Sequence, residues 1–170
     1  MPEQARKCDA LIIGCGPAGL SATLAAASKG ASTIILERLD RPGSKLLASG
    51  GGRCNVGNTL SAEAFMARFG RNGRFMSKAL EAASPEWLRD FLASTGVDSV
   101  AADSFHYFPK SGRAVDILNA FLDESKKLGA ELLSDVKAES IKANGKSFDV
   151  AAGGRIFEAK TVILAAGGCA

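Results

Sequence analysis

The sequence is poor in the residues that hydrolases and disulfide-stabilised proteins need. It has a single histidine, His106, and one histidine without an evident orienting carboxylate cannot supply a Ser/His/Asp or Cys/His catalytic set. The four cysteines, Cys8, Cys15, Cys54 and Cys169, lie far apart and form no C-x-x-C pair. This spacing argues against a disulfide framework, a zinc knuckle and a disulfide reductase. Reduced thiols in a cytoplasmic protein are the simplest interpretation.

Long apolar runs and long runs of one charge are also missing. No stretch approaches the roughly 18 uninterrupted apolar residues of a membrane-spanning helix, so we expect no membrane association. Lys+Arg 21 against Asp+Glu 18 gives a net charge of +3, which argues weakly against a dedicated binder of nucleic-acid phosphates. With 170 residues the chain is long enough for a real core but too short for two full domains, so we expect one domain over residues 1–170.

The first part of the chain predicts a βαβ unit. Residues 8–13 form a short apolar run that is typical of a strand buried on both faces of a parallel sheet. Residues 14–19 supply a glycine-rich turn, residues 17–29 a helix and residues 32–37 a second strand. Residues 38–60 show no convincing periodicity, and a loop of that length inside a compact domain is usually functional.

The rest of the chain predicts more helices and strands. Helical patterns fall at 62–69, 75–83, 85–94 and 114–128, and further strands at 131–134 and 160–166. From Val136 to Ala159 apolar and polar residues alternate between glycine turns, which predicts a three-stranded antiparallel meander. The fold class we predict is therefore α/β and Rossmann-like, with a parallel sheet and helices plus a three-stranded antiparallel β-meander.

The strongest chemical signal is the G-x-G-x-x-G turn between the first strand and the first helix, in which Pro17 and Ala18 open the helix. Gly14 permits the tight turn, Gly16 lets the backbone approach a pyrophosphate, and Gly19 lets the helix pack against the sheet. Glu37, at the tip of the second strand, is placed to accept hydrogen bonds from an adenosine ribose and to repel the 2′-phosphate of NADP. FAD or NAD is therefore expected, although Arg38 keeps NADP open.

A second glycine cluster at residues 45–55 combines a bare backbone, including Gly51 and Gly52, with the cations Lys45 and Arg53 and the amide of Asn55. Consecutive N–H groups in such a loop can form an anion nest, and Arg53 can fork onto a phosphate. Arg53 also makes the surroundings of Cys54 electropositive, which is expected to lower the pKa of that thiol.

Five segments, in the same order along the chain, resemble the BaiN/RdsA-type flavoproteins. They are G-C-G-P-A-G, L-E-R, G-S-K-L-L-A-S-G-G-G-R-C-N, F-P-K-S-G-R-A and V-I-L-A-A-G-G. This family contains NAD(P)/FAD-dependent oxidoreductases with the FAD-binding fold of glutathione reductase. The resemblance implies bound FAD, hydride or electron transfer with a small-molecule substrate, and possible use of NAD(P)H as electron donor.

The resemblance also assigns roles. It implies that the first glycine turn holds the FAD pyrophosphate, that residues 45–55 lie along the flavin, that Val136 offers backbone contacts to the adenine, and that Ala166 and Gly167 form a second contacting turn. Ala166 departs from the threonine usual there. The expected cofactor-binding residues are Gly14, Gly16, Pro17, Ala18, Gly19, Glu37, Arg38, Lys45, Gly51, Gly52, Arg53, Cys54, Asn55, Val136, Ala166 and Gly167. The sequence does not identify the catalytic residues, and we expect no metal ligand.

Similar proteins are considerably longer, with a substrate domain and a final segment that closes over the flavin. We therefore expect an incomplete FAD-binding domain. Three alternatives stay open: an NAD-binding Rossmann dehydrogenase, a noncatalytic nucleotide-binding fragment, and an RNA-modifying flavoprotein. The last would use the basic stretch of Arg68, Arg71, Arg74 and Lys78, but no aromatic stacking platform is expected beside it.

Overall fold

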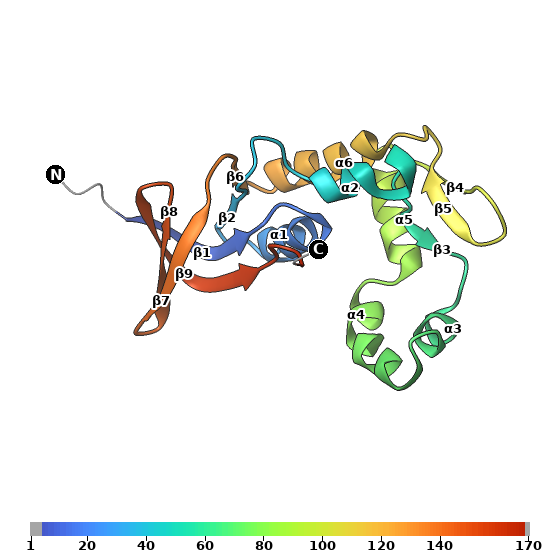
Figure 1. Cartoon of the computed structure of the whole chain (residues 1–170), viewed down its shortest axis with the longest axis horizontal. Coiled ribbons are helices and arrows are strands. Elements are labelled where there is room, and N and C mark those ends of the chain that lie inside the picture. The colour runs from blue at the N-terminus through green and yellow to red at the C-terminus, as the bar shows by residue number, and fades with distance from the viewer. Residues whose placement is uncertain (1–4, 169–170) are drawn as a thin grey trace. The chain divides into compact units, whose positions relative to one another are not determined.

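The computed structural model describes residues 5–168, which divide into two compact units. The first unit comprises the chain up to Leu46 and from Phe121 onward, and the second comprises Leu47–Ala120. Figure 1 shows the strands of the first unit in blue, orange and red and the helices of the second unit mainly in green. Helix α6 (Ala114–Lys127) begins with residues of the second unit and ends with residues of the first.

The first unit is built on a six-stranded sheet with the order β6-β2-β1-β9-β8-β7. The strands are β1 (Arg6–Ile13), β2 (Thr33–Leu36), β6 (Glu131–Leu133), β7 (Ala138–Asn144), β8 (Ser147–Ala152) and β9 (Arg155–Leu164). Strand β1 pairs in parallel with β2 and β9, and β2 pairs in parallel with β6. Strands β7, β8 and β9 pair successively antiparallel. The predicted parallel sheet and the predicted meander are both confirmed.

The prediction of a separate last strand at 160–166 is wrong, because it is continuous with the third strand of the meander. In β9, Phe157, Glu158 and Ala159 pair with β8 on one side and β1 on the other, and the strand continues beside β1 as far as Leu164. Lys160 looks like a strand boundary in the sequence, but its side chain is exposed and its Nζ lies 2.7 Å from a carboxylate oxygen of Asp9. A solvated ion pair lets a charged residue occupy the middle of a strand.

The core of the first unit follows from its apolar strands. Leu11 and Leu36 are buried in one cluster with Val150 and Phe157 from the meander. Helix α1 (Pro17–Ala27) lies against β1, β2 and β9 and buries Leu20 with other residues of the same face. Full burial of each such side chain stabilises the fold by about 1.5–3 kcal/mol. The predicted βαβ unit is therefore held by the residues that defined its pattern.

The second unit combines short helices with a small antiparallel sheet of order β3-β5-β4. Its elements are η1 (Ser49–Gly52), β3 (Gly57–Asn58), α3 (Ala62–Ala67), η2 (Gly70–Met76), α4 (Ser77–Ala82), α5 (Pro85–Ser94), β4 (Ser99–Ala101) and β5 (His106–Pro109). Helix α2 (Ser44–Ala48) contains the division at Leu46. Helix α5 has the predicted bounds, and the Ser84 hydroxyl accepts the N–H of Trp87 at 3.2 Å as its cap.

Two sequence predictions for this region need correction, and one feature was missed. Residues 38–60 are not structureless, since they form α2, η1 and β3. The helix predicted at 75–83 begins at Ser77, because the segment before it is the 3₁₀ turn η2. The three-stranded sheet was not predicted, since two to four residues are too few to show an alternating pattern.

Candidate functional site

A cavity of about 420 Å³ lies at the carboxyl ends of β1 and β9 in the first unit. It is lined by Gly14, Cys15, Gly16, Pro17, Ala18, Glu37, Arg38, Leu39, Gly43, Ser44, Lys45, Leu164, Ala165, Ala166 and Gly167. Ligands of open α/β sheets bind outside the carboxyl ends of the parallel strands. The structure thus brings most of the predicted cofactor-binding residues to the expected edge of the sheet.

The glycine turn is held in a shape that side chains would not allow. Gly14 has a φ of +104°, and a Cβ placed there would lie 2.4 Å from the carbonyl oxygen of Ala165. A Cβ on Gly19 would lie 1.9 Å from the carbonyl oxygen of Gly14. The positive φ of Gly14 agrees with the tight turn predicted there, and the lack of room at Gly19 agrees with the predicted packing of α1 against the sheet.

Gly16 is different, because its hydrogen faces open space. A Cβ there would have no atom within 4 Å, although Gly16 lines the cavity. Gly16 is also the N-cap of α1, and no side chain caps this helix end. Without such a cap, the first N–H groups of the helix have no partner. Together with the positive end of the helix dipole, they can bind an anion. The geometry therefore suits close approach of a phosphate.

Glu37 is buried, with 9% of its surface exposed, and both of its carboxylate oxygens accept backbone hydrogen bonds. Oε2 accepts the N–H of Cys15 at 2.9 Å and Oε1 accepts the N–H of Leu39 at 3.0 Å. The sequence did not predict this role, since Cys15 occupies an unspecified position of the glycine motif and Leu39 lies outside it. An ionised carboxylate has about four acceptor positions, so two remain for hydroxyl groups of a ligand.

The backbone of Glu37 connects the cavity to the start of the meander. Its N–H donates to the carbonyl of Leu133 at 2.9 Å, and its carbonyl accepts the N–H of Val136 at 2.8 Å. A smaller cavity of about 220 Å³ lies here and is lined by Ile13, Gly14, Leu36, Glu37, Arg38, Val136, Lys137, Ala138 and Ala166. Gly14, Glu37, Arg38 and Ala166 line both cavities. Val136 lines only the smaller cavity, which these shared residues connect to the larger one.

Lys45 lies beside the second predicted turn. A Cβ placed on Gly167 would be 3.5 Å from Lys45 Nζ, and Gly167 has a φ of +84°. Both residues line the larger cavity together with Ala166 and the exposed Arg38. Two cations thus face a site whose glycine turn also favours an anion.

The predicted residues Gly51, Gly52, Arg53, Cys54 and Asn55 belong to the second unit. Gly51 and Gly52 have φ values of +66° and +85°, and a Cβ on either would meet no atom within 4 Å. The guanidinium of Arg53 lies 4.2 Å from the ring centroid of Phe108. Its Nε also donates to the carbonyl of Gly50 at 3.3 Å. The Arg53 side chain is therefore held by Phe108 and by the carbonyl of Gly50 within the second unit.

The expectation of a lowered pKa at Cys54 is wrong. Cys54 is 6% exposed, and burial raises the pKa of its thiol despite a hydrogen bond with Ser49. Burial likewise raises the pKa of Cys15 to about 12, with the Glu37 carboxylate adding to the effect. A buried thiol at such a pKa is protonated at neutral pH and chemically inert. Cys169 lies outside the described residues.

His106 has the orienting carboxylate that the sequence did not reveal. Its Nδ1 lies 2.9 Å from Oδ2 of Asp103, three residues earlier in the chain. Asp103 also accepts the backbone N–H groups of His106 and Phe105, and these hydrogen bonds lower the pKa of its carboxyl to about 2. Both side chains are substantially exposed, at 42% and 54%, so the pair lies in a solvated turn of the second unit.

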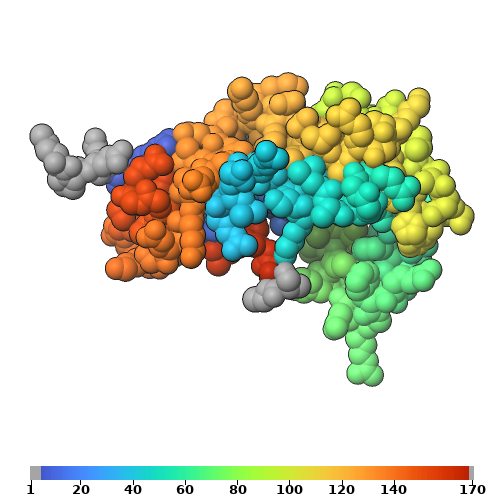
Figure 2. Space-filling view, turned by 45° about the horizontal axis from the view of Figure 1, so that its top comes forward, coloured from blue at the N-terminus to red at the C-terminus, as the bar shows by residue number. Residues whose placement is uncertain are grey.

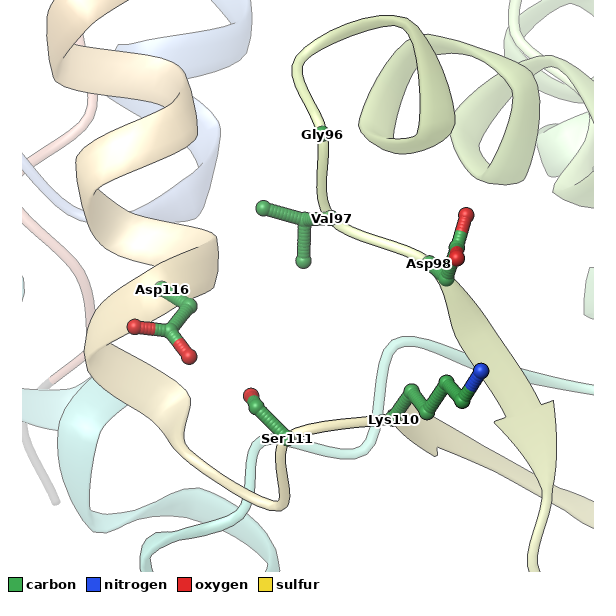
Figure 3. A pocket seen from close by; sticks show the side chains of 6 residues that line it. All are labelled: Gly96, Val97, Asp98, Lys110, Ser111 and Asp116. Atoms are coloured by element: carbon green, nitrogen blue, oxygen red, sulfur yellow. The ribbon is translucent and has the colours of Figure 1, made fainter.

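A further cavity of about 290 Å³ in the second unit is lined by Gly96, Val97, Asp98, Lys110, Ser111 and Asp116 (Figure 3). In Figure 3 the Ser111 hydroxyl and the Asp116 carboxylate turn toward the same space, while Lys110 points away. Both polar groups already have partners, because Ser111 Oγ accepts the N–H of Arg113 and Asp116 forms an ion pair with Arg113. They stabilise the start of α6.

Residues 5–168 contain neither a candidate metal centre nor a helix that could span a membrane. No cluster of three or more His, Cys, Asp or Glu side chains in this range is arranged to hold a metal ion. Within the same range, every helix is too short or too polar to cross a lipid bilayer.

The chain is similar to known enzymes that are much longer. It is 34% identical over 160 residues to the 3-dehydro-bile acid delta(4,6)-reductase of Clostridium scindens, a match that covers 92% of this chain and 38% of the reductase. It is 29% identical over 168 residues to the ribosomal RNA dihydrouridine synthase of Escherichia coli K12, covering 94% of this chain and 39% of the synthase. The chain thus spans well under half the length of these curated relatives.

Solved structures show the same fold at lower sequence identity. A flavocytochrome c3 fumarate reductase superposes with a TM-score of 0.72 and 23% identity, over 98% of this chain and 34% of the reductase. A 3-ketosteroid dehydrogenase from Rhodococcus jostii superposes with a TM-score of 0.69 and 18% identity, over 95% of this chain and 46% of the dehydrogenase. The predicted Rossmann-like fold is confirmed. The sequence matches the HI0933-like protein Rossmann domain family over residues 8–170, and the chain belongs to that family.

Proposed function

We propose that this chain binds FAD in the cavity of the first unit and forms the cofactor-binding part of a flavin-dependent oxidoreductase. The observation that carries the proposal is the glycine turn, in which the position of Gly16 stays open to a ligand while Gly14 and Gly19 are closed by backbone contacts. The family membership and the similarity to a bile acid reductase support it.

The described residues fit an adenine dinucleotide. The bare backbone at Gly16 and the start of α1 would hold the pyrophosphate, with Pro17, Ala18 and Arg38 beside it. The two spare acceptor positions of Glu37 would bind the adenosine ribose, and the backbone at Val136 would contact the adenine. Lys45, Ala166 and Gly167 would lie toward the flavin end. We assign Gly51, Gly52, Arg53, Cys54 and Asn55 to the flavin side on the family resemblance.

Bound FAD would supply a ring that accepts and releases electrons or hydride. The chain's own part is to bind and orient that group, for which the backbone N–H groups of the glycine turn and the fixed carboxylate of Glu37 are suited. We place a small organic molecule opposite the flavin, with a nicotinamide nucleotide as possible electron donor. The buried, reduced thiols Cys8, Cys15 and Cys54 suit a cytoplasmic protein.

The test is a binding titration of the purified chain with FAD and with NAD, followed by flavin fluorescence and calorimetry. Wild type should bind FAD, and Gly16→Ala should weaken binding at least tenfold because the new methyl group enters the cavity. Gly57→Ala is the matched control, since Gly57 also lacks atoms within 4 Å of its Cβ position but lies in β3 of the second unit.

The outcomes separate the alternatives. Binding of NAD without FAD would favour a nicotinamide-dependent dehydrogenase, and binding of neither would overturn the assignment of the cavity. FAD binding that Gly16→Ala leaves unchanged would show that FAD binds elsewhere on the chain.

A further inference from the structure

The second unit carries a surface that is both basic and apolar, and the proposed flavin site does not use it. It is formed by α3, η2 and α4, residues 62–82, which we call the basic lobe. Residues 64–80 contain Arg68, Arg71, Arg74 and Lys78 and no acidic residue. In Figure 1 these elements lie together in the green part of the chain, and the green atoms in Figure 2 project from the surface of this unit.

Three cations of the basic lobe have no acidic partner. Arg68, Arg71 and Arg74 are exposed, and none of them forms an ion pair with another residue of the described range 5–168. Lys78 differs, because its Nζ lies 2.8 Å from a carboxylate oxygen of Glu81. The lobe therefore presents three guanidinium groups, each of which can form a two-pronged contact with a phosphate.

Two phenylalanine rings lie among these arginines and face the solvent, although the sequence predicted no aromatic platform here. Phe75 is 93% exposed and Phe69 is 51% exposed. Each ring directly follows an arginine in the chain, as Arg68-Phe69 and Arg74-Phe75. Nearly all of the apolar surface of Phe75 is in contact with water, so transfer of this ring into an apolar environment is favourable.

The shape of the basic lobe favours a flat and fluid partner. The lobe projects from its unit in Figure 2, and none of the three cavities described above is lined by one of its residues. A folded protein binds through a closely complementary surface, and a nucleic-acid single strand is usually held in a charged groove. The lipids of a bilayer rearrange around a projecting group, so a bilayer needs neither.

Contacts inside the lobe hold its charged and apolar groups in place. Phe69 packs edge-to-face on Phe65, with 5.2 Å between ring centroids. Gly73 is buried, and a Cβ there would lie 2.0 Å from the carbonyl oxygen of Met66, so η2 contacts the end of α3 with no room for a side chain. A preorganised surface loses less conformational entropy when it binds.

We propose that the basic lobe docks on the surface of an anionic phospholipid bilayer, with Phe75 inserted at the level of the lipid headgroups and chains. Arg68, Arg71 and Arg74 contact the lipid phosphates. Binding at a membrane surface grows with the apolar area that is buried and with the attraction of basic groups to anionic lipids, and the lobe supplies both. The sequence argument against membranes concerned spanning helices, which surface binding does not need.

The test is co-sedimentation of the full chain with phospholipid vesicles at several salt concentrations. Wild type should bind vesicles of equimolar phosphatidylcholine and phosphatidylserine, less strongly as salt is added, and should not bind phosphatidylcholine alone. Phe75→Ala should weaken binding about tenfold, because the inserted apolar area is lost. Phe75→Leu should stay within about threefold of wild type, since leucine buries a similar apolar area. Phe75 is almost fully exposed, so these changes leave the fold intact.

Insertion is measured directly with a tryptophan probe. In a Trp87→Phe background, which removes the native tryptophan, Phe75→Trp supplies a fluorophore in the basic lobe. Its emission should shift to shorter wavelength when anionic vesicles are added, and lipids with brominated chains should quench it.

Charge is tested with the triple change Arg68→Gln, Arg71→Gln and Arg74→Gln. Binding to the anionic vesicles should fall on the order of a hundredfold, because each basic residue near such a surface contributes about fivefold. Lys126→Gln with Lys142→Gln and Lys146→Gln is the control, since these exposed lysines lie in the first unit and removing them changes the charge equally. The control should bind nearly as wild type does, because charges that do not reach the surface are screened.

Any of five outcomes would overturn the proposal. They are no binding to anionic vesicles, equal losses in the control and the triple variant, a loss in Phe75→Leu as large as in Phe75→Ala, no emission shift in the Phe75→Trp variant, and tighter binding to polyglutamate or to a single-stranded oligonucleotide than to the vesicles. The last would point to an acidic protein or a nucleic acid as the partner. The assay contains no flavin, so its result is independent of whether FAD binds the first unit.

Discussion

The contact between Gly19 and Gly14 gives a prediction in which local propensity and packing oppose each other. Inside a helix alanine is favoured over glycine by about 1 kcal/mol, so propensity alone predicts that Gly19→Ala stabilises the protein. The new Cβ would lie 1.9 Å from the carbonyl oxygen of Gly14 and 3.3 Å from Cγ2 of Ile12. The carbonyl belongs to the backbone of the turn and cannot rotate away as a side chain would.

Forcing extra atoms into a packed site costs about 1–3 kcal/mol and sometimes more. Because α1 must move away from β1 to relieve the contact, we expect the upper end of that range, or about 2 kcal/mol net after the helix propensity is subtracted. With a urea m-value of about 2 kcal/mol/M, the unfolding midpoint should fall by about 1 M.

Urea unfolding followed by far-ultraviolet circular dichroism measures this change. Gly16→Ala is the matched control three residues earlier, where the Cβ meets no atom within 4 Å, and its unfolding free energy should stay within about 0.5 kcal/mol of wild type. If Gly19→Ala proved as stable as wild type or more so, close helix–strand packing would not be the reason for glycine at this position.

Three further predictions concern titratable side chains. Glu37→Gln should lower the unfolding free energy by about 2 kcal/mol, because an amide offers one acceptor oxygen to two backbone donors; an unchanged urea midpoint would contradict the hydrogen bonds assigned to it. In a Cys169→Ser background, Cys54 should react with iodoacetamide at pH 8 much more slowly in the folded chain than in urea, since burial raises its thiol pKa; rapid labelling of the folded chain in mass spectra would refute this. Hydrogen bonds with His106 lower the carboxyl pKa of Asp103 to about 2. The ionised carboxylate therefore stabilises the fold above the ordinary carboxyl pKa of about 3.9, and this stabilisation is lost as the pH falls toward 2. The difference in unfolding midpoint between wild type and Asp103→Asn should therefore shrink over this range, and a constant difference would count against the pairing.

The sequence predicts the first unit well because its signals are local. Apolar runs of four to eight residues, a glycine turn and an acid at a strand end are sufficient to place β1, α1, β2 and Glu37. The meander also follows from alternation and from its Asn-Gly and Gly-Gly turns. The break proposed at Lys160 was wrong because its ion pair with Asp9 comes from a neighbouring strand that is distant in the sequence.

The second unit was harder to predict because contacts between distant residues determine it. The strands of its sheet are short, and the environment of Arg53 depends on Phe108, more than 50 positions away. The carboxylate that orients His106 is only three residues away, but no periodic pattern marks it. The pKa of the Cys54 thiol was wrongly predicted because burial, which raises it, is not visible in the order of residues.

Strand β9 belongs to two structures at once, and this has a consequence for engineering the chain. Its first half completes the antiparallel hairpins, and its second half ends at the residues that border the larger cavity. One residue inserted at Asn144-Gly145 would lengthen a solvent-facing tip and leave the ligand-facing backbone where it is. The same insertion after Ala159 would turn every following side chain to the opposite side of the sheet, so that Ala165 would no longer meet Gly14. Loop grafts therefore belong at the hairpin tip, and the length of β9 must be preserved.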